Sequence, residues 1–437
     1  MTGEADKIWV PRTEDEVREI LRQASRERIP VTISGAGTGV TGGRVAQGGW
    51  VLSLEKFTRI EIAEGRARVG AGVTLVALGA EAAKSGQFYA PDPTERTASI
   101  GGNIATNASG SRSFRYGSTR RHLLGLRVVL MDGSIHEYRR GEPIDFDVPA
   151  IPLPRTTKHS AGYPLQPGMD WVDLFCGSEG TLGIVTEAVV RLLPMPKSLI
   201  AGIVFFPEGH PAENAVDEWR TIEGLRMIEY IDGNSLDIMR PSWPDIPARA
   251  REALLIEHES DDIDPWIERL EAAGAMLEES WFATSAEDRE RFRRFRHALP
   301  ELVNAIVRQR GFKKISSDFA VPVAKSAELL TIYRCRLAEL FPGQHTLFGH
   351  IGDAHVHINV LPVSEEQSRQ AGELMAELAR QAVELGGTVA AEHGLGKRRT
   401  RFLAIQYAPE YIGAMKAVKR RLDPEWLLGR GTLFAYE

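Results

Sequence analysis

The sequence predicts an α+β protein of two or three domains, and three observations support this fold class. The chain of 437 residues is longer than one hydrophobic core usually supports, at roughly 150 residues per domain. Helix-like and strand-like patterns alternate over residues 8–85. The prolines at 194 and 196 close this first region, and a new strand pattern starts at Leu199. We therefore expect one domain to end near residue 196 and another to follow it.

The first elements are indicated by caps and by periodicity. Residues 13–28 predict a helix, because Thr13 and Glu16 have the spacing of a capping box ahead of an apolar stripe. Residues 30–34 alternate like a short strand, and residues 50–54 form an apolar run of strand length.

Later segments continue the alternation. Residues 67–71 predict a strand, and residues 74–84 predict a helix that Gly86 ends. Residues 141–170 hold six of the 24 prolines and show little periodicity, so we expect them to form a surface excursion. Residues 200–206 predict a buried strand at the start of the second domain.

Composition indicates an ordinary globular protein. The chain is 43% hydrophobic and 26% charged, and its net charge is −6 without a basic tract. These values argue against binding to nucleic acid or to an anionic membrane. No apolar run reaches the roughly 18–20 residues of a membrane span, and the N-terminus lacks an apolar signal region. Two cysteines cannot form a disulfide framework, so we expect a cytoplasmic protein in which Cys176 is a buried, inert thiol.

Residues 91–117 are the most informative stretch of the chain. Almost every residue is small, forms turns or can hydrogen-bond, and Ile100 and Ile104 are the only aliphatic side chains larger than alanine. Neither a core helix nor a half-buried strand has this pattern. We expect this backbone to wrap around a ligand that is rich in polar atoms.

Two further glycine-rich segments accompany this stretch. The loop at residues 35–43 follows a predicted strand, and successive peptide N–H groups in such a loop can bind a pyrophosphate. A plain turn is the alternative, and the spacing does not fit a Rossmann motif. Residues 177–185 form another glycine-rich turn that runs into a strand. Three such loops predict one large, extended, phosphate-bearing cofactor.

Histidines and carboxylates form a second candidate site. Four of the eleven histidines lie within His345–His357, and Glu392 and His393 follow on a glycine-rich loop. Imidazole and carboxylate together are the ligands that suit zinc or a similar divalent ion. Structural histidines with satisfied hydrogen bonds are the alternative.

Together these motifs resemble those of the FAD-linked oxidases of the vanillyl-alcohol oxidase / PCMH fold. The closest branch is the group of D-lactate, glycolate and D-2-hydroxyglutarate dehydrogenases. The resemblance runs from about residue 8 to about residue 435, and it rests on residues 35–43, 91–108, 115–119, 124–133 and 177–183.

The resemblance implies a domain organisation. A PCMH-type FAD-binding domain of two α+β subdomains is expected over residues 1–196. An α/β substrate (cap) domain is expected over residues 197–395, and a helical segment over residues 396–437 is expected to pack back onto the FAD domain.

The resemblance also implies FAD as the cofactor. The loop at residues 35–43 lacks the histidine that carries covalent flavin in some relatives, so non-covalent binding is expected. The residues expected to contact FAD are Gly35, Ala36, Gly37, Thr38, Gly39, Thr41, Gly42, Pro91, Asp92, Pro93, Thr94, Gly101, Gly102, Asn103, Thr106, Asn107, Gly110, Tyr116, Gly117, Gly177, Ser178, Glu179, Gly180, Gly183, Ile184, Val185 and Glu392.

In the metal-dependent members of this group, the positions of His350, His357 and Glu392 bind a divalent metal, here expected to be zinc or manganese. The resemblance makes His393 the base and places Asn359 in the substrate pocket.

Arg296 falls where the group places an arginine that grips the substrate carboxylate, and a guanidinium fork fits a carboxylate bidentately. An arginine on a helix surface is the alternative.

The implied activity is FAD-dependent oxidation of a D-2-hydroxy acid to the 2-oxo acid, by hydride transfer to flavin N5 with help from the metal. The implied electron acceptor is an electron-transfer flavoprotein, a quinone or a cytochrome. A homodimer is the oligomeric state that we consider. Two alternatives are a non-oxidative enzyme of the alkylglycerone-phosphate-synthase type and a non-catalytic flavoprotein subunit that relays electrons.

Three departures from the group's pattern stand out. Residues 354–355 are Ala-His where the group usually has Gly-Asn. Ser316 stands where some relatives use a lysine for a second carboxylate, which weakly disfavours a dicarboxylate substrate because Lys314 is only two residues away. Residues 429–431 are Gly-Arg-Gly in place of Asn-Pro-Gly.

Overall fold

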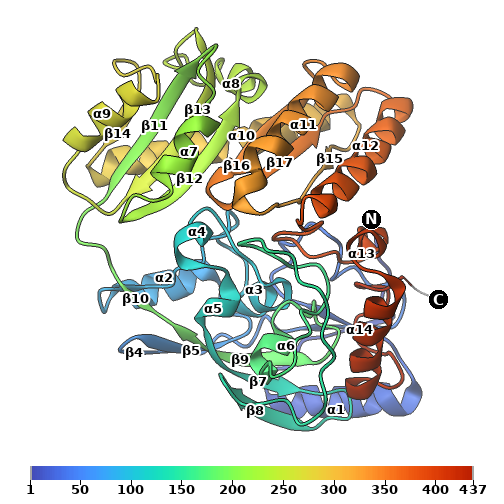
Figure 1. The fold of residues 1–437 in the computed structure, drawn as a ribbon. Helices are drawn as coiled ribbons and strands as arrows, with labels where there is room; N and C mark the ends of the chain where they lie inside the picture. Colours follow the sequence, from blue (N-terminus) through green and yellow to red (C-terminus); the bar gives the residue numbers. More distant parts are fainter. Residues whose placement is uncertain (1, 436–437) are drawn as a thin grey trace.

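The computed structural model describes residues 2–435, and its chain forms an upper and a lower half in the view of Figure 1. Within these residues every helix is too short or too polar to cross a lipid bilayer.

The lower half contains three sheets. A parallel sheet has the order β1 (Lys7–Trp9), β3 (Trp50–Ser53), β2 (Val31–Ser34). An antiparallel sheet has the order β4 (Ile60–Ala63), β5 (Arg66–Gly70), β9 (Ile184–Arg191), β7 (Leu123–Val129), β8 (Ile135–Arg139). A short ribbon joins β6 (Gln87–Phe88) to β10 (Leu193–Pro194).

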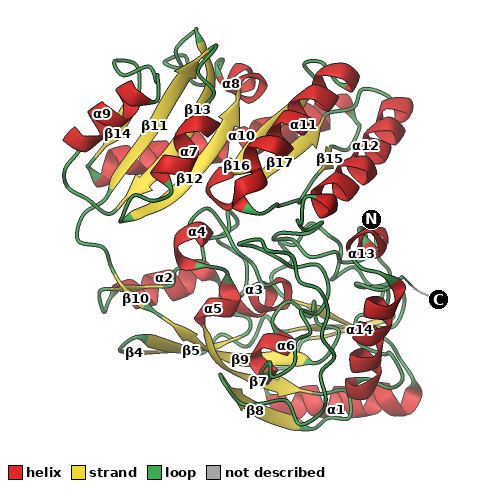
Figure 2. Ribbon diagram, viewed as in Figure 1, coloured by secondary structure: helices red, strands yellow, loops and turns green. Residues whose placement is uncertain are grey.

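Helices surround these sheets (Figure 2). They are α1 (Glu14–Glu27), α2 (Leu75–Ala83), α3 (Ile100–Thr106), α4 (Ser113–Tyr116), α5 (Thr119–His122), α6 (Trp171–Phe175), α13 (Leu403–Gln406) and α14 (Pro409–Leu422).

The upper half is one sheet between two layers of helices. Its strand order is β14 (Trp281–Ala283), β11 (Ile200–Pro207), β13 (Ala250–His258), β12 (Leu225–Asp232), β16 (His345–His350), β17 (His355–Val360), β15 (Ile315–Ser316). The helices are α7 (Glu213–Trp219), α8 (Gly233–Met239), α9 (Asp264–Ala272), α10 (Ala286–Arg310), α11 (Ser326–Leu340) and α12 (Glu365–Glu384). Short 3₁₀ turns cover Val323–Lys325, Ile351–Asp353 and Thr400–Phe402.

Two hydrophobic cores explain why helices cover both faces of this sheet. Helices α8 and α10 pack on one face through residues such as Leu236 and Phe295, while α7 and α11 pack on the other through Trp219 and Tyr333. The alternation of helix and strand expected over 197–395 is present. All strand pairs in this sheet are antiparallel, however, which alternation alone would not have indicated.

The predicted first helix is confirmed, with one difference in its cap. The Thr13 hydroxyl accepts the N–H of Glu16 at 3.2 Å, as expected of an N-cap. The Glu16 carboxylate accepts the N–H of Arg12 at 2.6 Å rather than that of Thr13. The reciprocal bond is therefore displaced by one residue.

Residues 91–117 differ from the prediction, because they contain short helices as well as loop. Ser99 caps α3, and its hydroxyl accepts the N–H of Gly102 at 3.3 Å. Asn107 ends α3 in the left-handed conformation at φ 50°. This seven-residue helix buries Ile100, Asn103 and Ile104, and two apolar residues are too few to show a helical period in the sequence.

The surface excursion predicted for residues 141–170 is wrong in one respect. Part of this segment is irregular yet buried, and Lys158, Tyr163 and Leu165 are at most 1% exposed. Tyr163 packs edge-on against Phe434, and α14 lies over Gly162 through Met415. Proline content predicted the lack of helix and strand, but burial depends on the C-terminal segment that returns to cover it.

The C-terminal chain joins the parallel sheet of the lower half. The N–H of Val31 donates to the carbonyl of Leu427 at 2.7 Å, and the N–H of Gly429 donates to the carbonyl of Val31 at 2.9 Å. Gly429 has φ 59°, a conformation that glycine adopts without strain.

Ion pairs join the two halves. Arg112, just before α4, donates two hydrogen bonds to Glu257 of β13 at 2.9 and 3.0 Å. Arg226 of β12 is 2% exposed and lies 3.2 Å from the same carboxylate. The functional groups described below lie near this junction.

Candidate active site

The candidate site starts with a β-hairpin. His350 ends β16, and His355 opens β17 as its register partner across the turn. His355, His357 and Asn359 are two residues apart, so the pleat of β17 turns all three side chains to one face. The turn itself holds Ala354 in the left-handed conformation at φ 51°.

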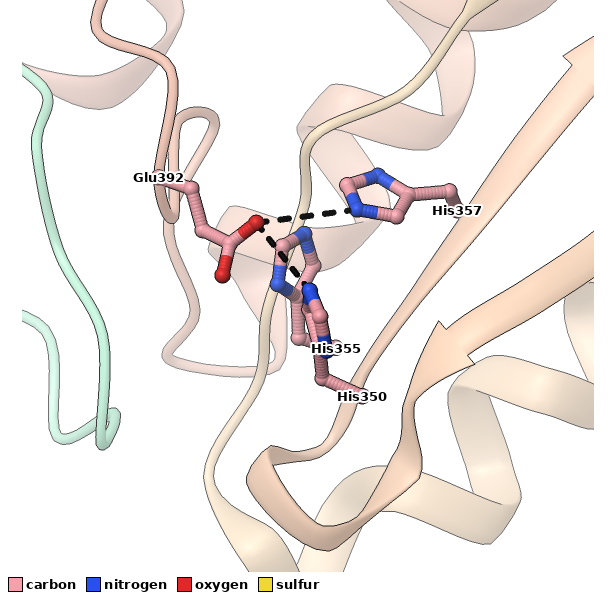
Figure 3. Close-up of side chains that lie close together, drawn as sticks. All are labelled: His350, His355, His357 and Glu392. Atoms are coloured by element: carbon pink, nitrogen blue, oxygen red, sulfur yellow. Dashed lines mark hydrogen bonds and ion pairs between the residues drawn. The ribbon is translucent and has the colours of Figure 1, made fainter. Parts of the chain in front are cut away.

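Glu392 approaches this hairpin from a separate loop (Figure 3). Its Oε2 lies 3.2 Å from Nε2 of His350 and 3.8 Å from Nε2 of His357. His350, His355, His357 and Glu392 each offer a ligand atom, and these four atoms all lie within 4.8 Å of one another. The resulting group comprises three imidazoles and one carboxylate.

A second carboxylate orients His350. Oε1 of Glu229, on β12, lies 2.5 Å from Nδ1 of His350. The other Glu229 oxygen accepts bonds from Nε and Nη2 of Arg296 at 3.0 and 2.9 Å. Burial favours neutral forms, but the carboxylates of Glu229 and Glu392 outweigh it and raise the pKa of His350 to about 9.

The two oxygens of Glu392 have different partners. Oε2 faces the histidines, while Oε1 accepts bonds from Lys158 at 2.6 Å and from the Ser109 hydroxyl at 2.8 Å. Burial opposes ionisation of Glu392, but His350 and Lys158 outweigh burial and hold its pKa well below the ordinary range. The carboxylate therefore bridges the hairpin of the upper half and two side chains of the lower half.

Lys158 is completely enclosed. Its ammonium group lies 3.2 Å from Asp353, which is also fully buried, and donates to the carbonyl of Gly110 at 3.0 Å. Burial lowers the pKa of a lysine, but Glu392 and Asp353 outweigh it and raise the pKa of Lys158. Lys158 is therefore charged, with its charge compensated.

Asp318 connects His393 to the hairpin. Its Oδ1 lies 3.0 Å from Nδ1 of His393 and 3.3 Å from Nε2 of His355, and its Oδ2 accepts the backbone N–H of His393 at 2.9 Å. Arg399 lies 3.6 Å from Oδ2. Burial lowers the pKa of His393, but the Asp318 carboxylate outweighs burial and raises it. Burial together with the neighbouring His357 lowers the pKa of His355 to about 3, so that this ring is neutral.

The buried donors fit a divalent ion. Three imidazoles and a carboxylate are ligands that zinc and related ions accept. The Glu229 contact leaves Nε2 of His350 for an ion, which is the usual arrangement of a carboxylate behind a metal-binding histidine. Because the pKa of His350 is raised, an ion that binds there would displace a proton.

The glycine-rich loops converge on one region. The N–H of Ala36 donates to the hydroxyl of Ser99 at 3.2 Å. The N–H of Glu179 donates to the carbonyl of Ala105 at 2.7 Å. Residues 39 and 43, both glycine, have no atom within 4 Å of the place where a Cβ would lie. The backbone is therefore open there for a large ligand such as FAD.

The same loops contact the loop that carries Glu392. The Thr41 hydroxyl donates to the carbonyl of His393 at 3.1 Å. The Glu179 carboxylate accepts the N–H groups of Leu395 and Gly396 at 2.8 and 2.7 Å. Burial of Glu179 raises its pKa to about 7, because these two bonds only partly offset the loss of water.

Replacing Glu179 with glutamine tests this electrostatic cost. The folded state binds a proton at Glu179 more tightly than the unfolded state, so the wild type should lose stability as the pH rises from about 4.5 to 7. The glutamine variant does not titrate there. We therefore expect the unfolding free energy of the wild type to fall relative to E179Q by about 1–3 kcal/mol between pH 5 and pH 8.

Urea unfolding at several pH values provides the measurement. The matched control is Glu64→Gln, at an exposed glutamate in the turn between β4 and β5. A constant difference between the wild type and E179Q across this range would contradict the expectation.

The structure brings the expected metal residues together and connects two other expected residues to them through carboxylates. The ligand atoms of His350, His357 and Glu392 lie close together. Arg296 is hydrogen-bonded to Glu229, which contacts His350, and Nδ1 of His393 lies against the carboxylate of Asp318. Arg296 lies on the inner side of α10, where its side chain is 15% exposed, rather than on an open helix surface.

Two residues expected to contact FAD, Ile184 and Tyr116, and the free thiol Cys176 have the following surroundings. Ile184 is fully buried in the hydrophobic cluster around α1, so its side chain belongs to the core. The Tyr116 hydroxyl donates to Glu259 of the upper half. Cys176 is buried, and burial raises its pKa to about 11, as expected of an inert thiol.

Five partners of the site were not predicted from the sequence: Ser109, Lys158, Glu229, Asp318 and Asp353. The only signal for Lys158 was its place in a polar stretch among prolines, and Glu229 looks like any acidic residue in a strand. All five are at most 5% exposed, and a charged residue at such depth needs a partner.

Comparisons with known proteins extend these observations. A family profile described as "FAD binding domain" matches residues 5–139, and one described as "FAD linked oxidases, C-terminal domain" matches residues 195–433. Together they match both sides of the junction that contains the site.

Curated relatives match over nearly the whole chain. "Glycolate oxidase subunit GlcD" of Bacillus subtilis (strain 168) is 31% identical over 98% of this chain and 89% of the relative. "D-lactate dehydrogenase" of Archaeoglobus fulgidus is 33% identical over 96% of this chain and 89% of the relative. "D-2-hydroxyglutarate dehydrogenase" of Xanthomonas citri pv. viticola is 30% identical over 98% of this chain and 89% of the relative.

A solved structure shares the fold. Alkyldihydroxyacetonephosphate synthase superposes with a TM-score of 0.69 at 17% identity, covering 97% of this chain and 76% of that chain. At this level of identity the likeness concerns the architecture alone.

Proposed function

The chain belongs to the FAD linked oxidases and is an FAD-dependent oxidoreductase, and on this basis we propose that it oxidises a D-2-hydroxy acid to the 2-oxo acid. One observation carries the proposal. Glu392 lies at the junction of the two matched regions. One of its oxygens faces His350 and His357, and the other accepts bonds from Lys158 and Ser109 of the lower half. The names of the relatives point to the same substrate class.

Two bound groups are part of this proposal. When bound, FAD would accept the hydride from C2 of the substrate, and a divalent ion held by His350, His357 and Glu392 would polarise the 2-hydroxyl. The chain's own residues bind the acid, orient it and receive its proton.

His393 is the proposed base. Its Nδ1 lies 3.0 Å from Asp318, which leaves Nε2 to take the hydroxyl proton of the substrate. Asp318 then stabilises the imidazolium that forms, and its bond to the His393 N–H fixes the backbone at this position. Without Asp318 the ring would be free to rotate away.

Arg296 is the proposed partner of the substrate carboxylate. It donates two hydrogen bonds to Glu229, so its remaining N–H groups stay available and its fork is held rigidly. Asn359 lies on the same strand face as His357 and accepts a bond from the Ser316 hydroxyl at 2.9 Å. The guanidinium of Arg296 is therefore the group that would donate hydrogen bonds to one substrate carboxylate.

We propose a monocarboxylate as the preferred substrate. Ser316 faces Asn359 with a short neutral side chain, and it offers no charge for a second carboxylate. The reduced flavin is proposed to pass its electrons to an electron-transfer flavoprotein, a quinone or a cytochrome.

Anaerobic bleaching of the flavin tests this function. The FAD-loaded protein would be mixed with D- and L-lactate, glycolate and D-2-hydroxyglutarate, before and after treatment with a chelator. We expect D-lactate or glycolate to bleach the visible absorbance, and L-lactate not to. The bleaching should be lost on chelation and restored by Zn²⁺ or Mn²⁺.

The variant Arg296→Met sharpens this experiment. We expect at least a tenfold higher half-saturating acid concentration, because a charge-assisted bidentate bond is lost. The matched control is Arg293→Met, on the exposed side of the same helix and paired with Glu290. A yellow protein that no hydroxy acid bleaches would contradict the proposal and favour a non-oxidative reaction or an electron-relay subunit.

A further inference from the structure

We propose that His355 is a fourth protein ligand of the divalent ion, so that the centre has three histidines and one glutamate. This inference rests on the metal site of the proposed function. It adds to that site a side chain that the set expected from the sequence, His350, His357 and Glu392, does not include.

The position of His355 is the first argument. It belongs to the set of four side chains whose ligand atoms lie within 4.8 Å of one another. Its ring centroid lies 4.3 Å from that of His357 and 5.4 Å from that of His350. Ligand atoms about 2.1 Å from one ion are at most about 4.2 Å apart, so small side-chain rotations would close the set.

The missing hydrogen bonds of His355 are the second argument. The residue is 0% exposed, and neither ring nitrogen makes a hydrogen bond. A polar group buried in this way costs about 1–3 kcal/mol unless something satisfies it. His159 shows the usual solution, because it is partly buried and its two nitrogens bond to Thr388 and Tyr407 at 2.8 and 2.9 Å.

The contact with Asp318 is the third argument. Oδ1 of Asp318 lies 3.3 Å from Nε2 of His355, just as Oε1 of Glu229 lies 2.5 Å from Nδ1 of His350. A carboxylate behind one ring nitrogen fixes the tautomer and leaves the other nitrogen to the ion. Neither nitrogen is hydrogen-bonded, and with Nε2 facing Asp318 the nitrogen left for the ion is Nδ1. A carboxylate therefore lies behind the histidine on each side of the hairpin turn.

Charge balance is consistent with a neutral fourth ligand. The carboxylate of Glu229 already faces Arg296, that of Glu392 faces Lys158, and that of Asp318 faces Arg399. An imidazole adds a donor without adding charge, whereas a further carboxylate would need another buried cation.

X-ray absorption at the zinc edge tests the inference. The FAD-loaded protein, stripped of metal and reloaded with Zn²⁺, should show three imidazole ligands, and His355→Asn should show two. The dissociation constant for Zn²⁺, measured by chelator competition, should rise at least tenfold in H355N. The control His210→Asn removes an exposed histidine and should change neither value.

The outcomes separate this inference from the proposed function. Two imidazoles in the wild type, with an unchanged dissociation constant in H355N, would overturn the role of His355 and leave the site of His350, His357 and Glu392 intact. Zinc bound without any imidazole would contradict both. If H355N does not fold, the imidazole count of the wild type decides the question by itself.

Discussion

Replacing Glu392 with glutamine is expected to lower kcat/KM for the hydroxy acid by more than about a hundredfold. The reason is the position of one atom, because Oε2 of Glu392 is the oxygen that both His350 and His357 approach. Glutamine keeps the shape but offers a neutral amide, which is a far weaker ligand for a divalent ion. Steady-state kinetics and the metal content of the purified protein provide the measurement.

The matched control is Glu366→Gln, at an exposed glutamate of α12 that pairs only with surface residues. It should change neither activity nor metal content. Activity within fivefold of the wild type in E392Q, together with an unchanged metal content, would show that the carboxylate is not part of the reacting site.

The motif residues of the site could be predicted from sequence because they are local. His355, His357 and Asn359 share one strand, and Glu392 and His393 are adjacent. Residues this close in the chain form a short sequence motif that can be recognised without the structure. The positions of these residues relative to FAD, and their roles, remain predictions.

The groups behind this site could not be predicted, because tertiary structure alone brings them there. Glu229 lies 121 residues before His350, and Ser109 lies 283 residues before Glu392. No spacing rule spans such separations. The burial of residues 158–165 was not predicted for a related reason, since a proline-rich stretch usually lies on the surface and here the C-terminal helix packs over Gly162.

The fold shows the same division between local and long-range information. The helix at Glu14–Glu27 could be predicted from its N-cap and from the spacing of its apolar residues, whereas α3 is too short to show a helical periodicity. The antiparallel order of the large sheet depends on pairings such as Tyr230 with Gly349, which no local pattern encodes.

Glu392 gives this architecture a functional meaning. One of its oxygens faces residues of the upper half and the other faces Lys158 and Ser109 of the lower half. A change in the relative position of the halves would therefore pull on a proposed ligand. The residues that join the two halves and the residues of the proposed site are therefore in direct contact.

Replacing Lys158 with methionine is expected to cost about 3–5 kcal/mol of unfolding free energy, the range observed when one partner of a buried ion pair is removed. The methionine fills a similar volume, but it leaves the carboxylates of Glu392 and Asp353 enclosed without their common cation. Urea unfolding at pH 7 measures the effect. The control Lys56→Met removes an exposed lysine and should change stability by less than about 0.5 kcal/mol.

A double variant separates the charge from the packing. If the loss in K158M comes from the uncompensated carboxylate, adding Glu392→Gln should restore part of it, so that the two changes together cost less than their sum. Additive losses, or a loss below about 1 kcal/mol in K158M alone, would mean that water reaches this junction and screens the pair. In that case the lysine would orient Glu392 without holding the two halves together.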